Sequence, residues 1–171
     1  YERGLIHGRS LSSMIADNID TYLARFAAGG LDAEAARKEG STWINIMRNQ
    51  NADYAEEMRG IADGAELPLG DIAMLNARYE ITFGLFGDEA RASDNRAITD
   101  DADGCSTFGV LPETTANGHT VIGQNWDWLA GVHGRCAILL ITRNNGPNLI
   151  CYTEAGIVGG KMGVNEHGVG L

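Results

Sequence analysis

Apolar residues in the first half of the chain recur at three- and four-residue spacing, the period of an amphipathic helix. The helices that this spacing predicts are Arg9 to Ala28, Asp32 to about Met47, Tyr54 to Ala62, and Ile72 to about Ile81. Asp32 and Asp71 are placed to cap two of them. Gly4 and Gly8, just before the first run, indicate a turn or a close backbone approach. The first half is therefore expected to be helical.

From Cys105 onward the pattern changes to short apolar, β-branched runs separated by Gly, Asn and Pro. The predicted strands are Ser106 to Leu111, His119 to Asp127, Cys136 to Arg143, Leu149 to Glu154, Gly156 to Val164, and Gly168 to Leu171. Asn117-Gly118 is typical of a hairpin turn. We expect an antiparallel meander in which sequential strands pair. Helices followed by strands define an α+β protein.

The two patterns meet at the bond Gly104–Cys105, which follows a polar, acidic stretch from Phe83 to Asp103. We interpret that stretch as an exposed linker, and we divide the chain into a helical segment with linker, 1–104, and a β-rich segment, 105–171. Residues 1–104 hold 10 of the 13 Lys and Arg and 19 of the 23 Asp and Glu. The chain ends inside a strand run, so we expect a truncated part of a longer protein.

Composition excludes several functions. The net charge of −10 disfavours nucleic acid and anionic membranes as partners. Three cysteines without a C-x-x-C spacing predict neither a disulfide framework nor a zinc site, and no metal or cofactor is expected. No apolar run reaches the roughly 20 residues of a transmembrane helix. No signal peptide is visible, which favours a cytoplasmic location.

Cys105 is the candidate nucleophile, because a Gly-Cys bond at such a boundary is suited to self-cleavage. A free thiol has a pKa of about 8.5 and needs a base, whereas an amino-terminal residue offers its own α-amino group, with a pKa of about 7.7–8.0. The thiol can attack the carbonyl of Gly104, which has no side chain to block it, and water then releases the upstream piece. Ser106 and Thr107 are placed to hydrogen-bond the oxyanion or the new amine.

Two alternatives compete for Cys105. A Cys-His dyad would need a histidine, and His119 is the best placed of the four because its predicted strand pairs with that of Cys105. Alternatively Cys105 is a small buried residue at the start of a strand, which is the commoner fate of a cysteine. The Gly-Cys dipeptide taken alone favours this second alternative.

Longer motifs reverse that preference. Asp103-Gly-Cys-Ser-Thr107, Gly123-Gln-Asn-Trp-Asp-Trp128, Thr153-Glu-Ala-Gly-Ile157 and Gly163-Val-Asn165 closely resemble the acyl-coenzyme A:6-aminopenicillanic acid acyltransferase (isopenicillin N acyltransferase) family, in both order and spacing. The resemblance implies an N-terminal-nucleophile hydrolase with an αββα sandwich fold. It further implies a precursor that cleaves itself before the cysteine into two subunits that stay together as a heterodimer.

The resemblance also implies roles for single residues. Cys105 matches the nucleophile, Gly104 the residue before the cleaved bond, and Asp127 the active-site aspartate. Asn125 would either donate to an oxyanion or tie a turn. Trp126 and Trp128 are interpreted as packing residues rather than substrate contacts. Glu154 and Asn165 lie in the resembling motifs, and a functional and a structural role are equally open for each.

We therefore hypothesise an autoprocessed cysteine acyltransferase or amidohydrolase. Its substrate would be a small-molecule amide or thioester, with acyl-coenzyme A one candidate, and its intermediate a Cys105 thioester. The alternatives are a non-catalytic relative with a buried structural cysteine and a bile-salt-type N-acyl amide hydrolase.

Overall fold

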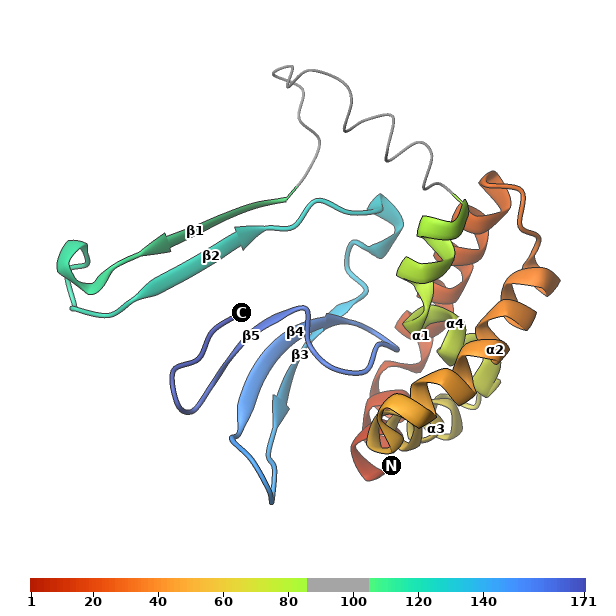
Figure 1. The fold of residues 1–171 in the computed structure, drawn as a ribbon, viewed down its shortest axis with the longest axis horizontal. Helices are drawn as coiled ribbons and strands as arrows, with labels where there is room; N and C mark the ends of the chain where they lie inside the picture. The colour runs from red at the N-terminus through yellow and green to blue at the C-terminus, as the bar shows by residue number, and fades with distance from the viewer. Residues whose placement is uncertain (86–104) are drawn as a thin grey trace, which may run out of the picture.

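The computed structural model describes residues 1–85 and 105–171, and Figure 1 shows their arrangement. The helices of the first part pack together on one side of the molecule. A three-stranded sheet, β3-β4-β5, lies beside them, and a separate two-stranded hairpin, β1-β2, projects away from the helices. This arrangement confirms the α+β class.

The labelled helices are α1 (Glu2–Ala28), α2 (Ala33–Gln50), α3 (Ala52–Ala65) and α4 (Leu69–Asn76), and residues 78–85 are helical again. Asp32 caps α2 as predicted, accepting the N–H of Ala35 at 2.9 Å. The prediction for Asp71 is wrong. Pro68 precedes α4, and Asp71 lies in its first turn, where it accepts a hydrogen bond from Arg37 Nε at 2.8 Å.

The start of α1 also differs from the prediction, because Gly4 and Gly8 lie inside the helix rather than in a turn before it. Their second predicted role, a close approach, is confirmed. A Cβ added to Gly4 would overlap the carbonyl oxygen of Glu57 on α3, and one added to Gly60 on α3 would overlap that of Tyr1. Glycines on both helices thus let the α1 and α3 backbones touch.

The hydrophobic core lies among the helices and extends into the second half of the chain. Tyr22 and Phe26 of α1 are fully buried with Ile61 of α3 and Leu75 of α4. Val132, Ala155 and Ile157 join this core from the segments before β3 and after β4. Burial of apolar area is the main stabilising term in folding, so the two halves of the chain stabilise each other.

The strands are β1 (Ser106–Val110), β2 (Val121–Asn125), β3 (Cys136–Ile141), β4 (Leu149–Glu154) and β5 (Met162–Asn165). Every labelled pair is antiparallel, as predicted. The prediction of a single meander is wrong, because the labelled strands form two sheets and β2 does not pair with β3. The predicted strand over 156–164 is shortened to β5. Residues 168–171 contribute only a bridge between Gly170 and Val164.

Polar side chains from the helices hold the segments at the end of the β3-β4 pair. His7 Nε2 accepts the N–H of Gly156 at 3.0 Å. Asn76 donates to Gly156 O at 3.0 Å and accepts from Val158 N at 2.9 Å. Asn18 donates to the carbonyls of Arg135 and Ala155. The chain around residues 154–158 is therefore fixed by the helical half.

Candidate active site

Cys105 and Asp127 lie together at the open end of the β1-β2 hairpin. The register pairs Ser106 with Asn125, so the residue before β1 faces the residues that follow β2. Cys105 Sγ accepts the backbone N–H of Asp127 at 3.3 Å. The structure thus brings together the two residues that the motifs indicated, through the sulfur and the backbone of the aspartate.

A cavity of about 890 Å³ opens beside Cys105. Its lining comes from both halves of the chain: Arg78, Tyr79, Cys105, Gln124, Trp126, Asp127, Trp128, Leu129, Ile157, Val158, Gly160, Lys161 and Met162. The volume falls in the range of ligand-binding sites, and aromatic walls with a few polar groups are typical of such sites. An exposed thiol and a carboxylate therefore share one space with room for a small molecule.

The remaining predicted residues do not reach this cavity. Ser106, Thr107 and Asn125 belong to the hairpin but not to the cavity lining. Asn125 lies between Gln124 and Trp126, which both line the cavity, and alternation along a strand turns its side chain to the other face. Their catalytic roles stay predictions. Gly104 lies outside the described residues, together with most of the predicted linker.

No histidine lines the cavity among the described residues. His7 is buried against Gly156, and burial lowers its pKa. His119 precedes β2 at the turn end of the hairpin, whereas Cys105 lies at the open end. At about 3.3 Å per residue, the four register steps between the ends amount to roughly 13 Å. The hypothesis of a Cys105–His119 dyad is therefore wrong.

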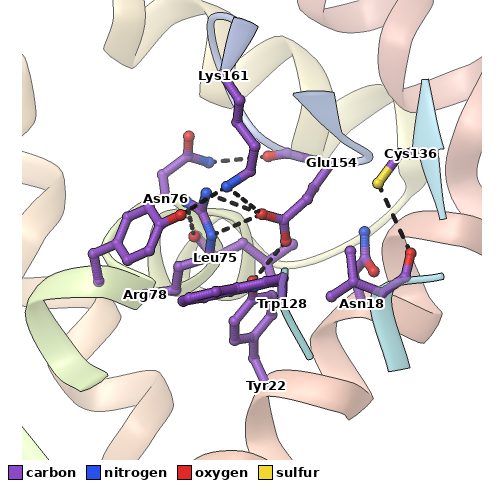
Figure 2. Close-up of polar contacts among 12 residues, drawn as sticks. Asn18, Tyr22, Leu75, Asn76, Arg78, Trp128, Cys136, Glu154 and Lys161 are labelled. Carbon is purple, nitrogen blue, oxygen red and sulfur yellow. Dashed lines mark hydrogen bonds and ion pairs between the residues drawn. The ribbon is translucent and has the colours of Figure 1, made fainter. Parts of the chain in front are cut away.

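The inner wall of the cavity is built around the fully buried carboxylate of Glu154, at the end of β4 (Figure 2). One of its oxygens accepts from Tyr22 OH of α1 at 2.6 Å. The other forms ion pairs with Arg78 Nη2 at 3.0 Å and Lys161 Nζ at 2.9 Å. The sequence left a functional and a structural role equally open for Glu154, and in the structure it connects both halves of the chain at the cavity wall.

Tyr22 extends the network to Trp128, whose Nε1 donates to the tyrosine hydroxyl at 2.7 Å. Burial, and secondly the charge of Glu154, raises the pKa of Tyr22, so its hydroxyl remains a donor to the carboxylate. Trp128 stacks on Trp126 with ring centroids 6.3 Å apart. Both tryptophans were interpreted as packing residues. They do pack, and they also form the cavity wall next to Asp127.

The three cysteines lie in different surroundings. Cys105 is exposed, Cys136 is half-buried and Cys151 is buried. Burial raises the pKa of both Cys136 and Cys151, which reduces their thiolate fraction near neutral pH. The alternative of Cys105 as a buried structural residue is therefore wrong, and Cys105 is the accessible thiol at the cavity.

Two absences characterise residues 1–85 and 105–171. No group of three or more His, Cys, Asp or Glu is placed to hold a metal ion there. None of the helices in these ranges combines the length and apolar character that crossing a bilayer requires.

The fold and site together define an α+β protein with a cysteine-bearing ligand cavity. No protein-family model matches the chain. It is, however, 33% identical over 176 aligned residues to the acyl-coenzyme A:6-aminopenicillanic-acid-acyltransferase 40 kDa form of Emericella nidulans. The alignment covers 99% of this chain and 43% of that relative. This likeness supports the family resemblance that the motifs indicated, and the chain spans less than half the length of this relative.

Proposed function

We propose that this chain carries the nucleophile of an autoprocessed cysteine acyltransferase or amidohydrolase, of the N-terminal-nucleophile type. The observation that supports this most strongly is the exposed thiol of Cys105. It lies against the backbone of Asp127 at the mouth of a cavity that no described histidine lines. Such a thiol lacks the usual imidazole base, and the α-amino group of Cys105 itself would replace it. The relative's acyltransferase name points to the same chemistry.

Self-cleavage would create that amino group. Cys105 Sγ attacks the carbonyl carbon of Gly104 and expels the Cys105 nitrogen, which gives a thioester in place of the peptide bond. Water then attacks the thioester carbonyl. Gly104 leaves with a free carboxylate, and Cys105 regains its thiol together with a free α-amine.

Turnover would follow the same bond changes on a small substrate. The α-amine takes the thiol proton, and sulfur attacks the acyl carbon of an amide or thioester, with acyl-coenzyme A one candidate. The leaving amine or thiol receives the proton. Water or a second amine then accepts the acyl group from Cys105. Asp127 would orient the α-ammonium or hold an amine of the substrate, because an anionic carboxylate in the cavity attracts either cation.

The two pieces produced by cleavage would remain together as a heterodimer. The Arg78–Glu154 ion pair, the Tyr22–Glu154 hydrogen bond and the His7–Gly156 hydrogen bond all join residues before position 104 to residues after it. The shared hydrophobic core crosses the same boundary. None of these contacts involves the bond that would be cut.

Acyl-enzyme trapping tests the proposed chemistry directly. The full-length protein is incubated with a panel of acyl thioesters and amides, quenched in acid and analysed by peptide mass spectrometry. We expect an added acyl mass on the peptide that contains Cys105, released by hydroxylamine, because thioesters react readily with that nucleophile. The Cys136→Ala variant should be acylated like the wild type, and the Cys105→Ala variant should not. Acylation that persists in Cys105→Ala would overturn the proposal.

A further inference from the structure

Among the described residues, the charges in the cavity wall do not balance. Glu154 supplies one carboxylate, while Arg78 and Lys161 supply two cations on the same oxygen of that carboxylate. The side chains of Arg78, Lys161 and Glu154 are 4%, 12% and 0% exposed. Either cation alone would neutralise Glu154, so one positive charge is in excess. An excess charge with so little contact with water is costly unless an anion approaches it.

The excess charge is presented to the cavity by Lys161. Two of the three hydrogens of its ammonium group are directed at Glu154 and at Tyr79 OH, which lies 2.8 Å away. The third remains for another acceptor. The ammonium also lies 4.4 Å from the ring centre of Trp126 and 5.6 Å from that of Trp128. Aromatic faces hold the cation in place and exclude water, but they do not neutralise its charge.

Among the described residues, Asp127 is the carboxylate that lines the cavity itself, and it does not serve as the missing counter-ion. The ion pairs within 1–85 and 105–171 do not include Asp127, so its carboxylate is more than 4.0 Å from both cations. It is exposed and belongs to the Cys105 side of the cavity. The cavity thus carries negative charge near the thiol and positive charge at Lys161.

We propose that Lys161, backed by Arg78, is an anion-binding subsite for a carboxylate of the substrate. The excess of a single charge fits a singly charged carboxylate better than a phosphate with nearly two negative charges. Because Lys161 and Cys105 line the same cavity, a bound molecule can place its carboxylate on the ammonium while its acyl group faces the sulfur. This subsite extends the proposed function, but its detection does not require turnover.

Alkylation of Cys105 by matched reagents tests the subsite without any acyl chemistry. Iodoacetate and iodoacetamide both form a carbon–sulfur bond with loss of iodide and the thiol proton, and they differ by one carboxylate. The measured quantity is the ratio of their rates at Cys105, read by peptide mass spectrometry. We expect Lys161→Met to lower this iodoacetate-to-iodoacetamide ratio by roughly three- to tenfold, because one nearby positive charge is removed.

The chain offers a matched control, since its only other lysine, Lys38, is exposed on α2. Lys38→Met changes the net charge equally and should leave the ratio unchanged. Lys161→Arg keeps the positive charge and should retain most of the wild-type iodoacetate-to-iodoacetamide ratio. Lys161→Met leaves a balanced Arg78–Glu154 pair, so the fold should persist, and circular dichroism verifies this. Equal ratios in wild type and Lys161→Met would overturn the subsite.

Protection experiments identify the anion. Benzoate and phenyl phosphate are compared at constant ionic strength for their ability to slow iodoacetamide alkylation of Cys105. We expect benzoate to protect the wild type and to lose that effect in Lys161→Met. Stronger protection by phenyl phosphate would overturn the assignment to a carboxylate. If the alkylation ratio depends on Lys161 while acyl trapping on Cys105 fails, the subsite stands and the proposed acyl-transfer function falls.

Discussion

At the scale of single residues, Glu154 determines the structure of the cavity wall. It accepts hydrogen bonds or ion pairs from Tyr22, Arg78 and Lys161, which come from three separate parts of the chain. Removing one partner of a buried ion pair leaves an uncompensated charge, and this costs more than the pair itself contributes. Here the loss of the carboxylate would leave two cations uncompensated.

Glu154→Gln should therefore lower the free energy of unfolding by about 3–5 kcal/mol. Urea denaturation measures this change, with Glu113→Gln, an exposed glutamate, as the control that should have no effect. The double variant Glu154→Gln/Lys161→Met should recover part of the loss, because it removes one of the two cations. Equal stability of Glu154→Gln and the wild type would contradict the role given to this carboxylate.

Sequence reasoning found Cys105 and Asp127 because each lies in a short motif whose order along the chain can be read directly. It missed Arg78 and Lys161 as cavity residues. Arg78 is 76 positions from Glu154, and this ion pair exists only after the halves have packed. No local sequence pattern indicates that Arg78 and Lys161 share the carboxylate of Glu154.

At the scale of elements, the contact between α1 and α3 depends on glycines. Gly4 and Gly60 lie where the two backbones touch, and a methyl group at either position would overlap a carbonyl oxygen of the other helix. Backbone atoms cannot move aside as the end of a side chain can. Substitution must therefore separate the helices and loosen the core between them.

Gly60→Ala should destabilise the protein by about 1–3 kcal/mol, the usual cost of overpacking. Gly84→Ala is the matched control, because Gly84 is helical and, among the described residues outside its own stretch of helix, no atom lies within 4 Å of an added Cβ. That change should be neutral or slightly stabilising, since alanine has the higher helix propensity. Thermal unfolding of both variants decides the matter, and a Gly60→Ala variant as stable as Gly84→Ala would refute the close packing.

Periodicity predicted most of the helices and strands, and Asp32 correctly predicted the start of α2. It placed the start of α1 too late, because glycines that normally weaken a helix are required here by the contact with α3. It also missed the break at Ala77, which separates α4 from the helical residues 78–85. The division into two sheets was not predictable from strand patterns, since pairing partners are set by tertiary packing.

At the scale of the whole molecule, the two halves are joined by polar contacts that depend on protonation. His7 on α1 accepts the N–H of Gly156 through Nε2, so that nitrogen must be unprotonated. Burial lowers the pKa of His7 in the folded state below its usual value of about 6.5. At a pH between the lowered pKa of folded His7 and its usual pKa of about 6.5, the unfolded chain binds a proton that the folded chain does not.

The contribution of His7 to the free energy of unfolding should therefore be fully present above about pH 6.5. It should decline as the pH falls toward the lowered pKa of folded His7. The contribution of one such group is at most about 1.4 kcal/mol per pH unit. His7→Gln, which can still accept from Gly156 but does not titrate, should show a shallower loss between pH 6.5 and 5. His167→Gln, at an exposed turn, should behave like the wild type. Identical urea midpoints for all three proteins across this range would contradict the assignment.

The central claim is that Cys105 becomes the amino-terminal nucleophile, and intact-mass spectrometry of the freshly purified full-length protein tests it most directly. We predict two polypeptides divided between Gly104 and Cys105, which co-purify because the core and the Glu154 network span both. Cys105→Ala should give a single uncut polypeptide, and Cys105→Ser should be cut more slowly because a hydroxyl is the poorer nucleophile. A wild-type protein that stays uncut while it acylates Cys105 would contradict the amino-terminal mechanism.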